Sequence, residues 1–591
     1  MKSFIKHTMA TVVGIFLTMT LFSIISIISI VAMIATVDVS TPIKEKSILR
    51  INLSGSLAER SDANPFASLM GEEGESLSLE ETMQALDKAA KNNNIIGVYL
   101  DGGTLDATPG MAQELRQALL KFKESGKWVI AYSDSYSEAS YYLSSVADSV
   151  LLNPEGNVDF SGLSSQVMFY KDVLEKVGVK MQVFKVGTYK SAVEPFICTE
   201  MSPANREQVT SYLLSIWTNM LKDVAGSRNL EVSRLNSLAD SMTIISEASM
   251  AVNGGLVDKL CYMDEVKAIL REKCGYKNSD DDLIFASTSD VAKSEMHNEN
   301  TGEEVAVYYA YGEIVQSENS GLSMGQEHQI VGEKMIKDLQ ELREDNDVKA
   351  VVIRVNSPGG SAFASEQIWR EVCLLKEKKP VVVSMGGMAA SGGYYISCAA
   401  NRIFAEPTTL TGSIGIFGMI PDISELMTKK IGLKFDVVNT NKMSDIGSMA
   451  RPFNAAESAQ MQKMINRGYD LFTKRVAEGR GMVQDSVKII AEGRVWTGEQ
   501  GLNIGLVDEL GNLDDAVTYA AKLAKIEEYR AVSYPDADNP FDQLMNQTKS
   551  EYLDSELREM LGDSYSAFFL MRNVKNIDRV QARLPFELNI K

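Results

Sequence analysis

From Ala389 to Ile416 the chain reads AASGGYYISCAANRIFAEPTTLTGSIGI, and this stretch has a counterpart in the first half. The counterpart is SEASYYLSSVADSVLLNPEGNVDFSGL, from Ser137 to Leu163, in which a tyrosine pair, a proline and a glycine recur 253 positions earlier. Matches continue outward at a slowly drifting spacing, which is typical of a duplicated domain with loop insertions. The matched pairs run from Gly55 with Gly312, through Tyr141 with Tyr394, Pro154 with Pro407 and Gly162 with Gly415, to Gly255 with Gly505.

Each repeat alternates short β-branched runs with helical patterns. Strands and helices in this order predict an α/β fold in which mostly parallel sheets are flanked by helices. The prediction is therefore two similar α/β domains in tandem. In the second repeat the predicted strands are AVVIRV (350–355), PVVVSM (380–385) and RIFAE (402–406), and the predicted helices are SEQIWREVCLLKEK (365–378) and ISELMTKKIG (423–432).

Changes in composition divide the chain into four parts. We expect an N-terminal membrane anchor in residues 1–45, a first repeat in residues 46–277 and a second repeat in residues 305–591. The segment between the repeats, 278–304, is polar and acidic without apolar periodicity, and predicts a linker. From about residue 535 the second repeat continues as an extension that matches no motif.

The N-terminal part carries no charged side chain from Thr8 to Val37. An apolar run of this length, with the span at about 9–37, is long enough to cross a bilayer with some tilt. Lys2 and Lys6 precede it, so the positive-inside rule places the N-terminus in the cytoplasm and the body outside. A cleaved signal peptide is the alternative, but its apolar core is usually much shorter. We therefore expect one retained membrane helix.

The bulk composition argues against two kinds of site. The 591 residues include 59 basic and 79 acidic side chains, which gives a formal net charge of −20. Nucleic-acid binding needs a basic face, so we expect no nucleic-acid partner. The five cysteines show no CxxC spacing, which indicates neither a zinc site nor a disulfide framework.

Two glycine-rich turns follow predicted strands of the second repeat: NSPGGS (356–361) and GGMAASGG (386–393). Ligands of open α/β sheets bind at the carboxyl ends of strands, and paired glycines expose backbone N–H groups there. Such N–H groups can stabilise an oxyanion, and Ser391 stands where a helix should begin. Ser391 is thus either a nucleophile or an ordinary helix N-cap.

A nucleophilic serine needs a base, and the histidines do not provide one. His7 lies beside the predicted anchor, His297 in the predicted linker, and His328 in a polar stretch away from any strand end. A carboxylate or a lysine of lowered pKa remains. Lys190 lies in the apolar stretch MQVFKVGTYKSAVEPF (181–196), although Lys185 in the same stretch fits almost as well.

The strings NSPGG, MAASGGYY, TGSIGI and GTYKSAVEPF, in a duplicated chain behind an apolar N-terminus, resemble bacterial signal peptide peptidase A in its long, two-repeat form. The resemblance runs from the anchor to about residue 530, and YKSAVEPF is its most specific string. It implies crotonase- or Clp-protease-like domains and a serine–lysine protease without a metal or organic cofactor. The implied roles are Ser391 as nucleophile, Lys190 as general base, Gly360 and Gly392 as oxyanion donors, and Ser413 as the group that orients the lysine.

The resemblance also implies a setting for this chemistry. The substrates would be signal peptides left in the membrane after their cleavage, and possible further substrates are other unfolded segments. The protein would be a homotetramer of the bacterial cytoplasmic membrane, with its body on the outer side. Two alternatives stay open: a crotonase-like acyl-CoA enzyme, which uses similar glycine turns, and a catalytically inactive membrane scaffold of the same fold.

The two repeats differ at the positions of the implied dyad. By the repeat spacing, Ser391 corresponds to Glu138, and Lys190 corresponds to Ser444. Each copy therefore holds one half of the dyad and lacks the other. A purely structural duplication gives no reason for this complementary divergence, so we expect one site that takes Lys190 from the first repeat and Ser391 from the second.

Overall fold

The computed structural model describes residues 42–60, 76–276, 282–294, 302–317, 328–535 and 580–583, with a few positions between 7 and 22. Within these ranges no helix combines the length and apolar character needed to cross a membrane. Most of the predicted span at about 9–37 lies outside the described residues.

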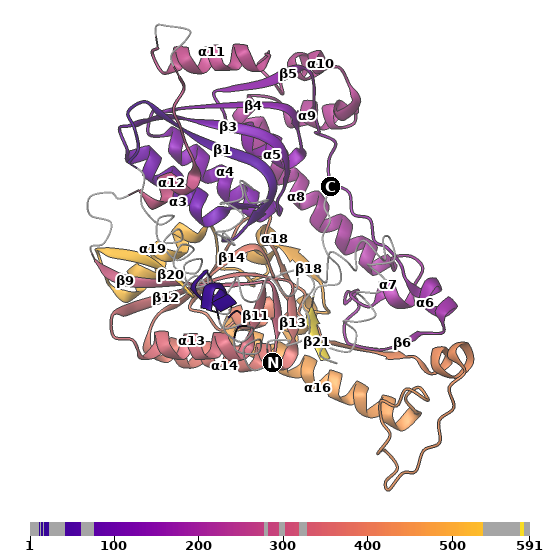
Figure 1. The fold of residues 1–591 in the computed structure, drawn as a ribbon. Helices are drawn as coiled ribbons and strands as arrows, with labels where there is room; N and C mark the ends of the chain where they lie inside the picture. Colours follow the sequence, from indigo (N-terminus) through magenta and orange to yellow (C-terminus); the bar gives the residue numbers. More distant parts are fainter. Residues whose placement is uncertain are drawn as a thin grey trace.

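The first repeat forms a sheet of seven strands whose pairings are all parallel (Figure 1). Its central strand order is β1-β3-β4-β5, and β3, β4 and β5 each follow a helix in the chain. Most apolar side chains on the four central strands are buried, as expected for a sheet covered on both faces. The strands are β1 (Ser47–Ala58), β2 (Ser76–Ser78), β3 (Ile95–Asp106), β4 (Trp128–Tyr136), β5 (Ser149–Val158), β7 (Lys259–Leu260) and β8 (Phe285–Ala286).

The second repeat forms an eight-stranded sheet with the same internal order, β9-β12-β14-β15, and one antiparallel pair, β16 with β18. The predicted strands at 350–355, 380–385 and 402–406 are confirmed as β12, β14 and β15. The strands are β9 (Glu303–Tyr311), β12 (Val348–Ser357), β14 (Val381–Ala390), β15 (Arg402–Ala405), β16 (Leu410–Gly412), β18 (Val495–Thr497), β19 (Glu509–Leu510) and β20 (Tyr529–Tyr534).

The helices repeat in the same order, which confirms the tandem duplication. The long helices α8 (Pro203–Arg228) and α16 (Ala455–Arg480) occupy equivalent places and have 26 residues each. In the first repeat the others are α3 (Leu79–Lys91), α4 (Pro109–Lys123), α5 (Glu138–Ser144), α6 (Lys171–Val177), α7 (Glu194–Ile197), α9 (Val232–Ala239), η1 (Thr243–Ile245), α10 (Ala248–Gly254) and α11 (Met263–Lys273). In the second they are α13 (Gly332–Glu344), α14 (Ala362–Lys378), α15 (Gly392–Ser397), η2 (Leu426–Ile431), α17 (Gln484–Ile490), α18 (Gly498–Asn503) and α19 (Leu513–Ala524).

Part of the predicted linker contributes to the first sheet. Within 278–304, β8 pairs with β1 just as β20 pairs with β9 in the second repeat. Helix α12 (Thr288–Lys293) follows β8, and the Lys88 amine of α3 donates hydrogen bonds to the Ala292 and Ser294 carbonyl oxygens. Strand β8 and helix α12 together contain only four small or apolar residues, which are too few to show a periodicity in the sequence.

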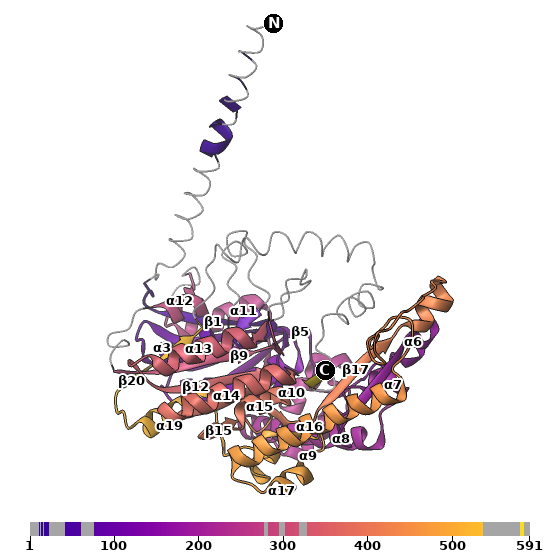
Figure 2. The same ribbon diagram turned by 90° about the horizontal axis from the view of Figure 1, so that it is seen from below.

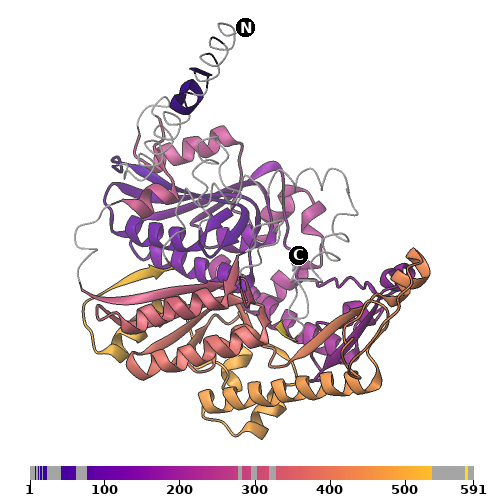
Figure 3. The ribbon, with the colours of Figure 1, turned by 60° about the horizontal axis from the view of Figure 1, so that its bottom comes forward.

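A third sheet draws strands from both repeats and from the C-terminal extension, in the order β11-β10-β13-β21-β17-β6. Strand β6 of the first repeat pairs antiparallel with β17 of the second. We call residues 423–453 the arm. Figures 2 and 3 show that the arm projects away from the two larger sheets together with β6 and β17. The strands are β6 (Lys180–Lys185), β10 (Glu313–Val315), β11 (Gln329–Val331), β13 (Gly359–Ser361), β17 (Phe417–Asp422) and β21 (Val580–Arg583).

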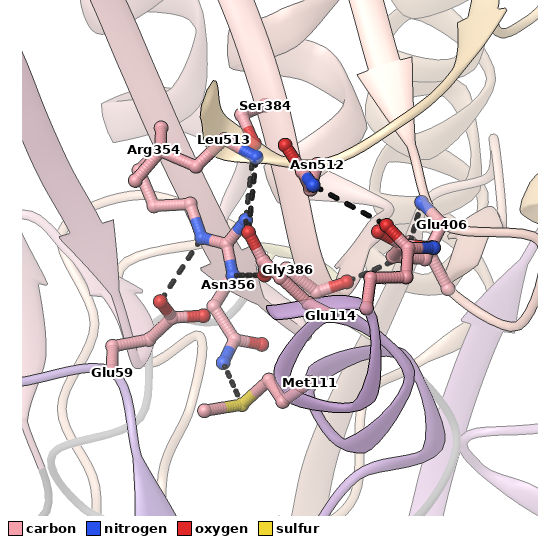
Figure 4. Close-up of polar contacts among 12 residues, drawn as sticks. Glu59, Met111, Glu114, Arg354, Asn356, Ser384, Gly386, Glu406, Asn512 and Leu513 are labelled. Atoms are coloured by element: carbon pink, nitrogen blue, oxygen red, sulfur yellow. Dashed lines mark hydrogen bonds and ion pairs between the residues drawn. The ribbon is translucent and has the colours of Figure 1, made fainter. Parts of the chain in front are cut away.

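A buried ionic cluster joins the two repeats (Figure 4). Arg354, on β12, lies 3.0 Å from Glu59 and 2.5 Å from Glu114 of the first repeat, and all three side chains are at most 3% exposed. The Arg354 guanidinium also donates to Ser384 on β14. Nearby, Glu406 accepts a hydrogen bond from Gln117 of α4, and burial raises the pKa of Glu406 to about 8. The cluster therefore joins α4 to β12 and to β14, the strand that precedes Ser391.

Candidate active site

Ser391 occupies a sharp turn between β14 and α15. Its φ of 54° and ψ of −110° are unfavourable for a residue with a side chain, and such strain is concentrated at functional sites. The turn is held by the Ser391 backbone N–H, which donates to the Gly412 carbonyl oxygen at 2.8 Å. Ser391 stands at the N-cap position of α15, but its hydroxyl makes no capping hydrogen bond to this helix within the described structure.

Lys190 reaches this turn from the other repeat. Its Nζ lies 2.8 Å from the Ser391 Oγ, 3.0 Å from the Ser413 Oγ and 3.2 Å from the Ser413 carbonyl oxygen. Lys190, Ser391 and Ser413 are each 0% exposed. Burial removes water from the amine and holds its pKa well below the usual value for lysine. Three of the five site residues predicted from the sequence therefore meet within hydrogen-bonding distance.

The predicted oxyanion glycines meet where the SPGG turn approaches the start of α15. The Gly359 N–H donates to the Ser357 Oγ at 3.1 Å, and the next residue, Gly360, lies opposite Ile314 of β10 and Ala582 of β21. A methyl group on Gly359 would lie only 2.7 Å from the Gly392 nitrogen. At φ values of 100° and 156°, Gly359 and Gly360 adopt backbone conformations that favour glycine.

Two glycines that sequence reasoning missed make room for the lysine. A methyl group on Gly415 would lie 3.2 Å from the Lys190 Cδ, and one on Gly493 would lie 2.7 Å from the Lys190 Cβ. Gly493 also has a φ of 75°. Gly415 belongs to the quoted string TGSIGI, but Gly493 follows no recognisable motif, so only its position beside Lys190 reveals its importance.

The loop that carries Lys190 is fixed by the second repeat. The Tyr189 N–H donates to the Glu492 carbonyl oxygen at 2.9 Å, and the Thr188 hydroxyl and N–H donate to the Glu492 carboxylate, each at 2.9 Å. On the other side, the Gln208 amide of α8 donates to the Tyr189 carbonyl oxygen and accepts from the Val495 N–H.

Arg494 connects the two halves of the site. Its guanidinium lies 4.7 Å from the Tyr189 ring centroid and 4.5 Å from that of Trp496, which are cation–π distances. The Arg494 carbonyl oxygen accepts from the Ser413 N–H at 2.7 Å. Arg494 thus contacts both Tyr189, the neighbour of Lys190, and the backbone N–H of Ser413.

The competing candidates lie elsewhere. Lys185 donates to the Lys190 carbonyl oxygen at 3.3 Å, and within the described structure no hydrogen bond joins it to Ser391. His328 is exposed and lies 3.4 Å from the Tyr311 hydroxyl. Glu138, the repeat counterpart of Ser391, accepts from the Gly162 N–H at 3.1 Å, and burial raises its pKa to about 7. Ser444, the counterpart of Lys190, lies in an exposed turn of the arm.

Potential metal ligands are scattered. Among the residues that the structure describes, no group of three or more histidine, cysteine, aspartate or glutamate side chains is arranged to hold a metal ion. All five cysteines are free thiols, and Cys261, Cys274 and Cys398 are buried.

Two α/β units on parallel sheets, with a serine on a strained strand-to-helix turn, define the class as a Clp-protease-like serine hydrolase. Comparison with known families agrees with this class. The model of Peptidase family S49 matches residues 121–277 and 374–527, and the model of Clp protease matches residues 303–410. The chain belongs to peptidase family S49, and it is a serine peptidase.

Relatives of known name match between 44% and 91% of the chain. Protease 4 of Salmonella typhi is 36% identical over 554 residues, which cover 91% of this chain and 87% of the relative. The chloroplastic serine protease SPPA of Arabidopsis thaliana is 31% identical over 85% of this chain and 73% of its own. The putative signal peptide peptidase SppA of Enterococcus faecium is 29% identical over 44% of this chain and 74% of its own. The resemblance drawn from the motifs is confirmed.

Proposed function

We propose that this peptidase works through a dyad in which Ser391 is the nucleophile and Lys190 is the general base. The observation that carries the proposal is the 2.8 Å separation of the Lys190 Nζ and the Ser391 Oγ at a site where both side chains are fully buried. A lowered lysine pKa increases the fraction of neutral amine, which is the form that can accept a proton.

The contacts of Lys190 give the amine an orientation. A neutral amine has two N–H groups and one lone pair. If the two N–H groups donate to the Ser413 hydroxyl and carbonyl oxygens, the lone pair points to the Ser391 hydroxyl. Ser413 is therefore a positioning residue in this proposal.

The reaction proceeds through an acyl-enzyme. Lys190 takes the Ser391 proton while Oγ attacks the scissile carbonyl carbon, and the protonated amine then gives its proton to the leaving nitrogen. Water hydrolyses the ester with Lys190 acting again as base. The Gly360 and Gly392 N–H groups stabilise the oxyanion in both steps. No cofactor takes part in this sequence.

The proposed substrates are signal peptides left in the membrane after their cleavage, together with other unfolded segments. This proposal rests on the motif resemblance and on the name of the Enterococcus faecium relative. It fits the predicted anchor at about 9–37, which would keep the body next to apolar peptides on the outer side of the cytoplasmic membrane. Protease added to spheroplasts should then digest the body, and a protected body would contradict this topology.

We propose a homotetramer as the assembled form. The resemblance supports it, and so does the arm, whose side chains include exposed apolar residues of a kind that association would bury. Light scattering on purified protein should show four chains per particle, and Val438→Glu, at a side chain that is 95% exposed, should shift the particle to smaller size. The members of this apolar surface are Ile431, Leu433, Phe435, Val437, Val438, Met443, Ile446 and Met449.

A serine-reactive fluorophosphonate probe tests the dyad directly. We expect the wild-type chain to be labelled and Ser391→Ala and Lys190→Met to remain unlabelled. Ser444→Ala is the matched control, because Ser444 is an exposed serine at the repeat counterpart of Lys190. Labelling that persists in Ser391→Ala would show that another residue is the nucleophile.

A further inference from the structure

Helix α8 of the first repeat packs against β18 of the second (Figure 1). One polar side chain of this helix, that of Gln208, is 0% exposed. Burial of a polar group costs free energy unless its hydrogen bonds are made, so the partners of this amide indicate what keeps it inside. These partners come from both repeats and lie on both sides of the candidate active site.

The amide nitrogen of Gln208 holds the residues on either side of Lys190. It donates to the Tyr189 carbonyl oxygen at 2.9 Å and to the Ser191 Oγ at 3.0 Å. A third acceptor, the Asn205 Oδ1, lies 3.0 Å away on the same helix. The loop is therefore attached to α8 immediately before and immediately after the proposed base.

The amide oxygen of Gln208 holds the other half of the site. It accepts from the Val495 N–H of β18 at 3.1 Å, and this contact fixes the orientation of the amide, because only its oxygen can accept. Val495 stands opposite Gly412 of β16, and the Gly412 carbonyl oxygen accepts from the Ser391 N–H at 2.8 Å. One amide thus ties the loop of Lys190 to the strand pair that holds Ser391.

The equivalent glutamine of the second repeat has a different environment. Helices α8 and α16 each have 26 residues, and Gln208 and Gln460 stand at the same position in them. Gln460 is exposed, and Ser444, the counterpart of Lys190, lies in the arm. Of these two glutamines, the buried one is therefore the one that contacts the loop of the proposed base.

We propose that Gln208 is a positioning residue for the dyad, which holds the Lys190 amine against Ser391 and keeps water away from it. The inference rests on the proposed function and adds a residue to it. Burial is what holds the pKa of Lys190 well below its usual value. A loosened loop would admit water and raise that pKa, so the position and the protonation of the base depend on the same hydrogen bonds.

Gln208→Leu, made in the full-length chain, removes these hydrogen bonds with a side chain of similar size. We expect kcat for a fluorogenic peptide to fall by about tenfold or more while KM changes little, because misplacing a catalytic group by even 1 Å is costly. The rising limb of the pH–activity profile should also move to higher pH, by about one unit, since the amine becomes better hydrated. An unchanged kcat together with an unchanged limb would overturn the proposal.

Two substitutions of the same kind separate positioning from a general structural role. Gln113→Leu removes another buried amide between the repeats, which is 6% exposed and accepts from the Thr408 hydroxyl at 2.8 Å. This variant should have a lower Tm and an unchanged limb. Gln460→Leu, at the exposed counterpart, should change neither. If Gln208→Leu also lowers Tm but keeps the wild-type limb, its role is structural and the proposal is wrong.

Gln208→Glu keeps the proposal testable if the leucine variant does not fold. Glutamate has the same shape and can still accept from the Val495 N–H, but its carboxylate cannot donate to the Tyr189 carbonyl oxygen. The added negative charge also favours the ammonium form of Lys190. The limb should again move to higher pH, and a wild-type limb would contradict the proposal.

The rate of fluorophosphonate labelling separates this inference from the proposed function, because it reports on Ser391 without peptide turnover. Labelling of Gln208→Leu should be about tenfold slower than that of the wild-type chain. Equal rates, with labelling that still requires Lys190, would reject the role of Gln208 and retain the dyad. Labelling that does not require Lys190 would reject the dyad and, with it, this inference.

Discussion

At the scale of single residues, Lys190 is the side chain on which the proposed chemistry depends most. Lys190→Met should lower kcat by about 10²–10⁴-fold or more, because a general base is lost. Lys190→Arg should be equally inactive, since a guanidinium stays protonated and cannot accept the serine proton. Turnover of a fluorogenic peptide measures both. Lys180→Met, at the exposed start of β6, is the control and should keep full activity.

The lowered pKa of Lys190 predicts how activity and stability depend on pH. Activity should rise with pH along a limb that lies below the usual lysine pKa, and flatten above it, within about pH 6 to 10. Between the folded-state and unfolded-state pKa values the unfolded chain binds more protons, so the stability contributed by this group rises with pH. Lys190→Met should therefore raise Tm near neutral pH, and the gain should shrink toward pH 10.5. A constant gain would contradict a buried amine of lowered pKa.

Gly493 provides a test of how tightly the lysine is held. Gly493→Ala places a methyl group 2.7 Å from the Lys190 Cβ, so kcat should fall by about tenfold or more while KM changes little. Gly505→Ala is the matched control: its φ of 78° imposes similar backbone strain, but its methyl group meets only the end of the Met482 side chain. Equal kcat values in the two variants would show that Lys190 tolerates displacement.

Motifs and a complementary repeat singled out Ser391, Lys190 and Ser413 in the sequence, and the structure brings these three side chains within hydrogen-bonding distance. Sequence reasoning could not choose Lys190 over Lys185 from the residues alone, since both lie in the same apolar stretch. It missed Gly493 and Arg494 altogether, because each acts through a contact made only when the two repeats are packed together.

At the scale of elements, the ionic cluster between β12 and α4 predicts a strong effect on stability. Arg354→Met would leave two carboxylates, those of Glu59 and Glu114, buried without their cation, at a cost of about 3–5 kcal/mol. Arg402→Met is the control: its pair with Glu509 is roughly one-third exposed, and its loss should cost less than about 1 kcal/mol. Urea unfolding of both variants measures the difference, and equal midpoints would contradict the role of the cluster.

The buried strands of the second repeat were predicted well from the sequence. The helix predicted over 423–432 and strand β21 are the exceptions, and each has a physical reason. Strands β12, β14 and β15 are buried β-branched runs, which the sequence shows clearly. The helix predicted over 423–432 is a single π-helical stretch, η2, without a buried side chain. Strand β21 has only four residues, which are too few to show an alternation of apolar and polar side chains. It is extended because it pairs with neighbouring strands from distant parts of the chain.

At the scale of the whole molecule, the proposed site takes Lys190 and Ser391 from the two repeats of one chain. We therefore expect no complementation when full-length Lys190→Met and Ser391→Ala chains are produced together, even if they assemble into one particle. The check is peptide hydrolysis by the co-purified mixture, each chain carrying a different tag. Activity above that of the single variants would mean that Lys190 serves the Ser391 of another chain.

The sequence predicted the tandem arrangement because homologous glycines, tyrosines and prolines keep their spacing. It did not predict which strands join the two repeats. The third sheet takes β6, β17 and β21 from three distant parts of the chain, and local patterns carry no information about such pairings.

The division of the dyad also has a genetic consequence. Recombination between the two similar halves of the gene would delete one unit of about 253 codons and leave a single repeat. A crossover before Glu138 would keep Ser391 but pair it with Ser444. A crossover after Lys190 would keep the lysine but retain Glu138, and one between them would keep neither. Every such deletion removes the proposed activity, so selection for that activity preserves the duplication once the two halves have diverged in this way.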